Sequence, residues 1–261
     1  MAARHNKRQS KEQRALIAVY ADTKRYFEGN DDIPEGQVID IEYEILSKEH
    51  TIPTTLTTIP ILEIINEDTL DMAHRYYSAQ TSSKILVLNM ASKYKPGGGV
   101  RNGRTAQEEC LFRRTNAFLT HHLSHYPMDD NKIIFSPDIT VIKDSHYNKI
   151  KPFHIGMISI PALSSPPVIL DKYQYPAHRA LMRLKIESIF EVAIVNEFDT
   201  LVLGALGCGV YKNPPEEVFK IFQNAINKYG HHFSRIGFAV LTFGANGKIN
   251  FNIFSKMVYG R

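Results

Sequence analysis

Tryptophan is absent, cysteine occurs only twice, and no apolar stretch approaches the ~20 residues that a membrane-spanning helix needs. Two cysteines cannot form a disulfide framework or a zinc site made of cysteines alone, and their scarcity suits a reducing compartment. The N-terminal segment MAARHNKRQSKEQR is basic but has no apolar core after it, so it does not resemble a secretory signal. We therefore expect an intracellular protein, in the cytoplasm or nucleus, without membrane association.

What is present is ordinary globular composition. The 261 residues are 43% hydrophobic and 22% charged, with 14 Phe and 13 Tyr, so the chain can bury a core without disulfides or metals. These figures exclude a mainly disordered protein. The length fits one large domain or two small ones.

The net charge of +4 owes much to the first residues of the chain. The cations there are Arg4, Lys7, Arg8, Lys11 and Arg14. Such a run either forms a basic arm for nucleic acid or, more commonly, is a frayed terminus that enters a helix. No zinc-finger spacing or RNA-binding aromatic signature is present, so direct DNA binding is not predicted.

The first part of the chain predicts an extension rather than a domain. Residues 10–27 place apolar side chains near one helical face, with Ser10 as a possible cap and Gly29 as a stop. Residues 37–46 alternate as a half-buried strand does, and the threonine- and proline-rich stretch 51–60 predicts a connection. Because so few residues cannot hold a core alone, we expect residues 1–56 to pack on a main domain formed by residues 57–261.

The main domain alternates apolar runs with helical patterns. Strands are expected at 59–65, 84–89, 132–142, 153–160, 200–206 and 236–243. Helices are expected from Asn66 or Asp68 to Ala79 and at 106–122, 177–195 and 216–229. This order predicts an α/β fold, a three-layer α/β/α sandwich with a mixed, mostly parallel sheet.

Chemistry gathers in two loops that follow buried strands. The first contains three consecutive glycines, Gly97, Gly98 and Gly99, which let the main chain approach a ligand closely. It leads into a helix start that carries Glu108 and Glu109. These glutamates either only compensate the helix dipole or belong to a site. Neighbouring helical residues project about 100° apart, so separate roles are more natural than one shared proton.

The second loop, GALGCGVYKNPP, begins at Gly204 after the strand that precedes it. Gly207 and Gly209 allow a nest of backbone amides around a diphosphate, and we expect a side chain at either position to block that ligand. The loop lacks both the GxxxxGK[ST] and the GxGxxG patterns. Loops at the carboxyl ends of strands converge in open α/β sheets, so the two loops are expected to form one site.

The run NMASKYKPGGGVRNGRTAQEECLFRRTN resembles the catalytic signature of microbial-type poly(ADP-ribose) glycohydrolases, a glycine triplet followed by Gln-Glu-Glu. GALGCGVYKNPP is similar to the diphosphate-binding loop of that family, and FSPDITVIKD and MISIPA resemble family segments in the same order. The resemblance covers about residues 57–243. It implies a macrodomain-like fold, in agreement with the sandwich predicted above.

The resemblance also implies roles for individual residues. Glu109 would be the general acid, Glu108 would hold ribose hydroxyls, and Gln107 would order the site. The glycine triplet would approach the scissile ribose, with Asn89 supporting it from the strand end. The diphosphate would lie against Gly207, Cys208, Gly209 and Val210. Tyr211, where the family often has Phe, would pack on the distal sugar or adenine, and Leu206 replaces a larger aromatic residue.

The implied activity is release of ADP-ribose from poly(ADP-ribose) by cleavage of ribose–ribose bonds, at chain ends because no clamp is evident. No cofactor or metal is required, and the expected partners are poly(ADP-ribose), ADP-ribose and ADP-ribosylated proteins. Two alternatives stay open: a non-catalytic ADP-ribose-binding macrodomain, and a hydrolase of mono-ADP-ribose linkages. Intact Gln107, Glu108 and Glu109 favour the glycohydrolase.

Three smaller features have ordinary explanations. His121 and His125 have a metal-ligand spacing, but no third ligand is evident, and helix capping is the better interpretation. Cys110 and Cys208 adjoin the two loops. A cysteine in such a position is more often a small buried hydrophobic residue than a catalytic thiol. Phe243, at the end of the last expected strand, is either core or an adenine contact.

Overall fold

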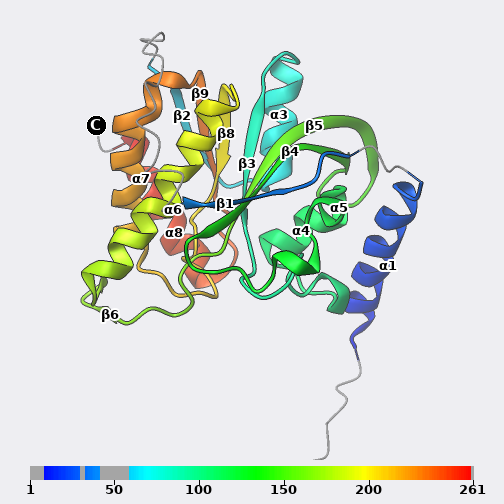
Figure 1. The fold of residues 1–261 in the computed structure, drawn as a ribbon, viewed down its shortest axis with the longest axis horizontal. Coiled ribbons are helices and arrows are strands. Elements are labelled where there is room, and N and C mark those ends of the chain that lie inside the picture. Colours follow the sequence, from blue (N-terminus) through cyan, green and yellow to red (C-terminus); the bar gives the residue numbers. More distant parts are fainter. Residues whose placement is uncertain (1–8, 30–32, 42–58, 260–261) are drawn as a thin grey trace, which may run out of the picture.

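The computed structural model describes residues 9–29, 33–41 and 59–259, and within them a seven-stranded sheet forms the centre of the molecule (Figure 1). The strand order is β1-β4-β5-β3-β8-β9-β2. The strands are β1 (Gln37–Asp40), β2 (Ile61–Ile65), β3 (Ile85–Met90), β4 (Lys132–Lys143), β5 (Lys149–Ile160), β8 (Thr200–Leu203) and β9 (Arg235–Ala239). A separate hairpin joins β6 (Val168–Ile169) to β7 (Lys172–Tyr173).

The sheet is mixed and mostly parallel. β5, β3, β8, β9 and β2 pair in parallel, whereas β4 is antiparallel to both β1 and β5. The β3–β5 register sets Asn89 opposite Ser159. Because β3 and β8 are neighbours, the loops that follow them leave the same edge of the sheet.

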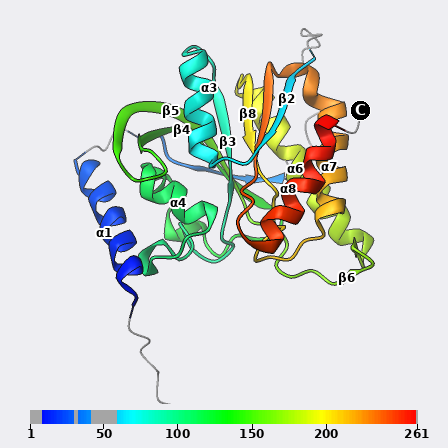
Figure 2. The same ribbon diagram turned by 180° about the vertical axis from the view of Figure 1, so that it is seen from behind.

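Helices cover both faces of the sheet, as Figures 1 and 2 show. Ile85 and Val87 of β3 pack toward one face, and Leu86 and Leu88 toward the other, as strand alternation requires. The first face is covered by α1 (Lys11–Tyr26), α3 (Thr69–Ala79), α4 (Gln107–Arg114) and α5 (Ala117–Thr120). The second is covered by α6 (Pro176–Val195), α7 (Pro215–Tyr229) and α8 (Gly244–Tyr259). The predicted α/β/α sandwich is confirmed.

Local sequence explains most element boundaries. α1 begins at a capping box in which the Ser10 hydroxyl accepts from the Gln13 N–H and the Gln13 side chain accepts from the Ser10 N–H. α3 begins after Asp68, whose carboxylate accepts from the Leu70 N–H at 2.8 Å. Of the predicted strand at 37–46, the structure describes residues 37–41. Within this part, β1 ends at Asp40. The predicted connection and the domain boundary near residue 56 lie outside the described residues.

Two expectations were wrong. The helix expected at 106–122 is broken at Thr115, which is extended and bridges Val141, while the Asn116 side chain accepts from the Thr140 N–H at 2.8 Å. The strand expected at 236–243 ends at Ala239, and α8 follows where no helix was expected. In both places tertiary contacts outweigh the local pattern.

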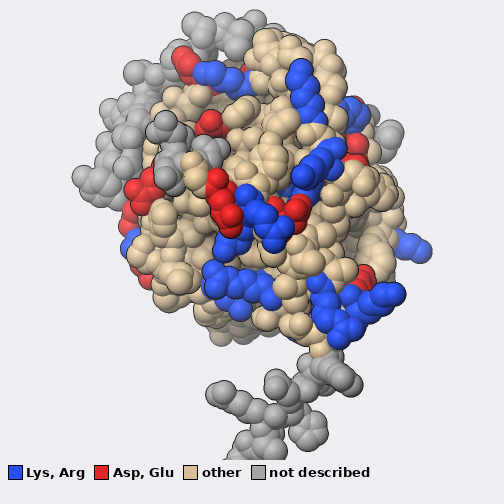
Figure 3. Space-filling view, turned by 90° about the vertical axis from the view of Figure 1, so that its right-hand side faces the viewer, with Lys and Arg blue, Asp and Glu red and all other residues tan. Residues whose placement is uncertain are grey.

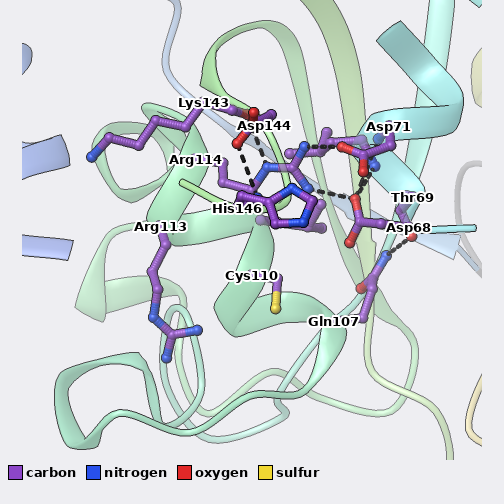
Figure 4. A network of polar contacts seen from close by, with 12 residues as sticks. Asp68, Thr69, Asp71, Gln107, Cys110, Arg113, Arg114, Lys143, Asp144 and His146 are labelled. Carbon is purple, nitrogen blue, oxygen red and sulfur yellow. Dashed lines mark hydrogen bonds and ion pairs between the residues drawn. The ribbon is translucent and has the colours of Figure 1, made fainter. Parts of the chain in front are cut away.

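Buried arginine fixes α4, the helix that carries the glutamate pair, onto α3. The Arg114 guanidinium is almost fully buried and forms ion pairs with Asp68 and, at 2.6 Å, with Asp71 (Figure 4). The same guanidinium donates to the Lys143 carbonyl at 2.9 Å. Removing one partner of such a buried pair leaves an uncompensated charge, so α4 is held firmly.

α1 is fixed to the same region from the other side. The buried Lys143 ammonium lies 2.8 Å from the Asp22 carboxylate and donates to the Thr23 hydroxyl at 2.7 Å, while the Thr23 hydroxyl donates to the Arg113 carbonyl of α4. The N-terminal helix therefore packs directly against α4. None of the described helices is both long and apolar enough to span a membrane.

Candidate active site

Gln107 docks the start of α4 onto the end of β3. Its side-chain amide donates to the Leu88 carbonyl at 2.7 Å and to the Thr69 hydroxyl at 3.3 Å, and its oxygen accepts from the Met90 N–H at 3.0 Å. Figure 4 shows the contact with Thr69. Gln107 thus completes hydrogen bonds that the strand leaves unmade at its end, and it sets where the next two residues lie.

Glu108 is buried beneath the glycine-rich loop. One carboxylate oxygen accepts from the Ser92 N–H at 2.8 Å, and the other accepts from the Gly97 N–H at 3.2 Å. Burial raises the pKa of Glu108 to about 8, and the neighbouring Glu109 charge adds to the rise, although the Ser92, Gly97 and Asn89 contacts oppose it. The site therefore keeps a proton at neutral pH.

Glu109 is held by one oxygen only. Oε1 accepts from the Gly99 N–H at 2.7 Å, whereas Oε2 is buried and has no hydrogen-bond partner among the described residues. A buried unpaired carboxylate oxygen costs free energy and is unusual in a structural role. Oε2 of Glu109 is therefore free to form a hydrogen bond with a reacting group, as acceptor or as donor.

Gly98 separates the two carboxylates and tolerates no side chain. Its φ is +52°, a conformation that glycine adopts readily. A Cβ there would lie 2.8 Å from Glu109 Oε1 and 2.9 Å from Glu108 Oε2. The close approach of backbone to both acids explains why the loop carries glycine before this helix.

Replacing Glu108 with glutamine should change how stability depends on pH. The folded protein keeps the Glu108 proton up to about pH 8, but the unfolded chain loses it near the ordinary value of 4.5. This contribution to stability is complete below the unfolded pKa and is lost as pH rises toward the folded pKa. Glutamine cannot ionise. As the pH rises from 5 to 8, the stability of Glu108→Gln should therefore fall less than the stability of wild type.

Thermal unfolding at several pH values measures the effect. The exposed Glu197, replaced in the same way, is the matched control and should follow the wild-type curve. A Glu108→Gln curve parallel to wild type over this range would contradict the raised pKa.

A buried polar chain orients Asn89. Its amide nitrogen donates to the Ser159 hydroxyl at 2.9 Å, and that hydroxyl lies 2.8 Å from His121 Nε2. Burial lowers the pKa of His121 to about 4, so the ring is neutral; its Nδ1 lies 2.9 Å from the Ala117 carbonyl and donates to it. Nε2 then accepts from Ser159. The Asn89 oxygen is buried and has no hydrogen-bond partner in the described part of the chain, so it is a second open acceptor near Glu108.

The second loop is joined to the first. The Lys93 N–H donates to the Tyr211 hydroxyl at 3.3 Å, so residues of both predicted loops meet. Asn213 shapes the second loop: its amide nitrogen donates to the carbonyls of Leu163 at 2.8 Å and Gly207 at 3.2 Å, and its oxygen accepts from the Tyr173 hydroxyl at 2.9 Å.

The predicted diphosphate residues differ in surroundings. Gly207 has φ +73° and a Cβ there would overlap the Asn213 amide, whereas a Cβ on Gly209 would meet nothing within 4 Å. Cys208 is buried, and Val210 is 84% exposed. Of the four predicted diphosphate residues, Gly209 and Val210 are the exposed ones.

Phe243 and Leu206 lie in contrasting environments. Phe243 is 93% exposed, between β9 and α8, so it does not belong to the core. A contact of Phe243 with adenine stays a prediction. Leu206 is fully buried.

The thiols and histidines give no sign of another chemistry. Burial raises the pKa of both Cys110 and Cys208, the opposite of what an activated nucleophile requires. Both are free thiols. Within the described ranges, no group of three or more His, Cys, Asp or Glu side chains has a metal-binding arrangement.

The glycine triplet and the acid pair lie within a recognised sequence family. The model of the microbial-type PARG catalytic domain matches residues 4–144, more than half of the chain. The chain belongs to this family. The match includes Gln107, Glu108 and Glu109 and ends before the second loop. Comparison with curated protein sequences gives no significant match.

Solved structures agree with the fold of a microbial-type PARG domain. Poly(ADP-ribose) glycohydrolase from Thermomonospora curvata superposes with a TM-score of 0.81 at 22% identity, over 94% of this chain and 99% of that one. The same protein bound to the inhibitor ADP-HPD gives a TM-score of 0.76 at 21% identity, over 93% and 99%. Poly(ADP-ribose) glycohydrolase from Deinococcus radiodurans in complex with ADP-ribose gives 0.73 at 23% identity, over 92% and 97%.

Three polar residues of this microbial-type PARG domain have contacts in the site that the sequence did not predict: His121, Ser159 and Asn213. Ser159 lies within an apolar strand, and only the β3–β5 register sets it beside Asn89. The expected helix-capping role of His121 is confirmed, because it is the C-cap of α5 and its Nδ1 donates to the Ala117 carbonyl; its contact with Ser159 through Nε2 was not expected. For Asn213, a polar residue just before Pro214 after a glycine-rich turn was the available signal.

Proposed function

We propose that this chain is a poly(ADP-ribose) glycohydrolase that releases ADP-ribose from polymer ends. The observation that carries the proposal is Glu109, held by the Gly99 N–H through one oxygen and left with its other oxygen buried and unpaired. The neighbouring Glu108 supplies the second carboxyl of the pair. Membership of the microbial-type PARG family supports the same substrate.

In the proposed reaction, the proton that the acid pair keeps at neutral pH passes from Glu109 Oε2 to the oxygen of the leaving ribose. The bond between that oxygen and C1″ of the terminal unit breaks through an oxocarbenium-like state. Water then adds to C1″ and returns a proton to Glu109. The products are free ADP-ribose and a polymer one unit shorter that ends in a hydroxyl.

The other residues bind and orient the terminal unit. The Glu108 carboxyl accepts from ribose hydroxyls, and the unpaired Asn89 oxygen accepts from another. The exposed backbone at Gly209 and Val210 faces the diphosphate. Tyr211 and Phe243 offer aromatic surface to the sugar or adenine at the far end.

Incubation with defined poly(ADP-ribose), followed over time by chromatography, tests the proposal. We expect free ADP-ribose from the earliest time point, as end-directed cleavage requires. Early release of oligomers would contradict the preference for ends. ADP-ribose binding by titration calorimetry without polymer cleavage would indicate a non-catalytic binding protein, and release only from mono-ADP-ribosylated protein would indicate the other hydrolase.

Gly209→Val should weaken ADP-ribose binding by about ten-fold or more while the fold survives. The protein leaves open space around an added Cβ, so only a bound ligand would meet the new side chain. Gly207→Val is the contrasting variant: its positive φ and its contact with Asn213 predict that stability and binding fall together. Calorimetric titration and thermal unfolding measure both. If folded Gly209→Val protein bound ADP-ribose with wild-type affinity, the diphosphate would not bind at this loop.

A further inference from the structure

Exposed cations gather where α1 begins and the glycine-rich loop ends. Figure 3 shows lysine and arginine side chains along the lower edge of the face that α1 occupies. The exposed cations that belong to these two segments are Lys11, Arg14, Arg101 and Arg104, here called the α1 basic surface. Two come from the N-terminal helix and two from the loop around the short helix η1 (Val100–Asn102).

Contacts between the helix and the loop make these cations one surface. A Cβ on Gly103 would lie 2.6 Å from the Gln13 carbonyl oxygen, so the loop backbone touches α1 between Lys11 and Arg14. Burial raises the pKa of the Tyr20 phenol, and the Arg101 charge opposes that rise, which places Arg101 near α1 as well.

The surface is contiguous with the acid pair. Gly99 donates its N–H to Glu109, and a Cβ on the same residue would overlap the Arg104 side chain. In Figures 1 and 2, α1 lies beyond α4, on the side away from α7 and α8. The second loop, which leads into α7, therefore lies on one side of Glu109, and the α1 basic surface lies on the other.

Among the residues that the structure describes, few acids accompany the cations of this surface. Glu12 is the acid between Lys11 and Arg14, and Asp22, further along α1, is already paired with the buried Lys143. Poly(ADP-ribose) carries a diphosphate in every unit, so each unit brings two negative charges. Cations spaced along a path attract such a polymer, with a strong dependence on salt.

We propose that the polymer on the leaving side of the scissile bond runs over the α1 basic surface, which binds the diphosphate of the unit next to the one released. This inference rests on the proposed function, because the terminal unit then lies between Glu109 and the second loop. A nucleic acid is also a polyanion, but contiguity of the surface with Glu109 favours the substrate polymer.

The test compares two variants that lose equal charge. Lys11→Gln/Arg14→Gln/Arg101→Gln removes three cations from the surface and keeps Arg104, which packs on Gly99. Lys84→Gln/Arg183→Gln/Lys220→Gln removes three exposed cations elsewhere and is the control. Both sets also carry Glu109→Gln when binding of labelled poly(ADP-ribose) is measured, so that binding is read without hydrolysis. Single-stranded DNA of similar length serves as competitor.

The surface variant should bind polymer about ten-fold more weakly at low salt, and the slope of log affinity against log salt should become shallower by about one to two. In the active background, its KM for polymer should rise while kcat and ADP-ribose affinity stay at wild-type values. Polymer binding and salt slope equal to the control would overturn the proposal, as would equal competition by single-stranded DNA. Absence of ADP-ribose release by wild type would instead refute the glycohydrolase function. The binding comparison does not depend on hydrolysis, so failure of the surface proposal can be told apart from failure of the proposed function.

Discussion

Glu109→Gln is expected to lower the rate of ADP-ribose release by about 10²–10⁴-fold, the range for loss of a general acid. Glutamine keeps the shape of the side chain and can still accept from the Gly99 N–H, which lies 2.7 Å from Oε1. It cannot give a proton to the leaving oxygen. Initial rates of ADP-ribose release at saturating polymer measure the effect on kcat.

ADP-ribose binding provides the internal check on this variant. Because the loop contact is retained, affinity for the product should stay within a few-fold of wild type. Glu197→Gln, at an exposed site, is the control for the same substitution away from the acid pair. A Glu109→Gln protein that releases ADP-ribose at the wild-type rate would exclude Glu109 as the acid.

Gly98→Val should reduce activity by about 10²-fold or more, because it displaces both carboxylates together. The new Cβ would lie within 3 Å of an oxygen of each acid, and the positive φ disfavours a β-branched residue. Either the loop or the acids must move. Steady-state rates and thermal unfolding, measured on the same preparation, separate loss of catalysis from loss of folding.

Gly29→Val is the matched control for this substitution. Gly29 has φ +79°, and an added Cβ there would meet no atom of the described residues within 4 Å, so the variant carries similar backbone strain beyond the end of α1, away from the acids. It should lose some stability and keep its activity. If Gly98→Val retained full activity, the close packing of this loop on the acid pair would have no catalytic importance.

The sequence predicted those parts of the fold in which local signals agree with packing. The helix α1 was predicted from an apolar face and from Ser10 as a cap, and both signals involve residues that are close in the sequence. α8 was missed because its first residues, Gly244 to Asn250, include glycine and asparagine, which have poor helix propensity. Burial of Phe254 and Met257 against the core stabilises this helix, and that burial is a tertiary effect.

The candidate site was predictable where its residues lie close together in the sequence. Glu108 and Glu109 follow the glycine triplet closely in the chain, so their proximity was visible. The link from His121 through Ser159 to Asn89 joins residues from three separate segments, and it exists only because β3 and β5 pair in this register. Likewise, the break at Thr115 depends on its bridge to Val141. Such contacts leave no periodic trace in a single sequence.

The position of β2 at the sheet edge constrains how the nascent chain acquires its structure. Within the part of the chain that the structure describes, β2 pairs only with β9, from which it is separated by most of the domain. During synthesis from the N-terminus, its apolar Ile-Leu-Glu-Ile-Ile segment emerges early and has no sheet partner until β9 has been translated. An unpaired apolar strand is prone to pair with other chains, so β2 is exposed to such pairing until β9 has been made.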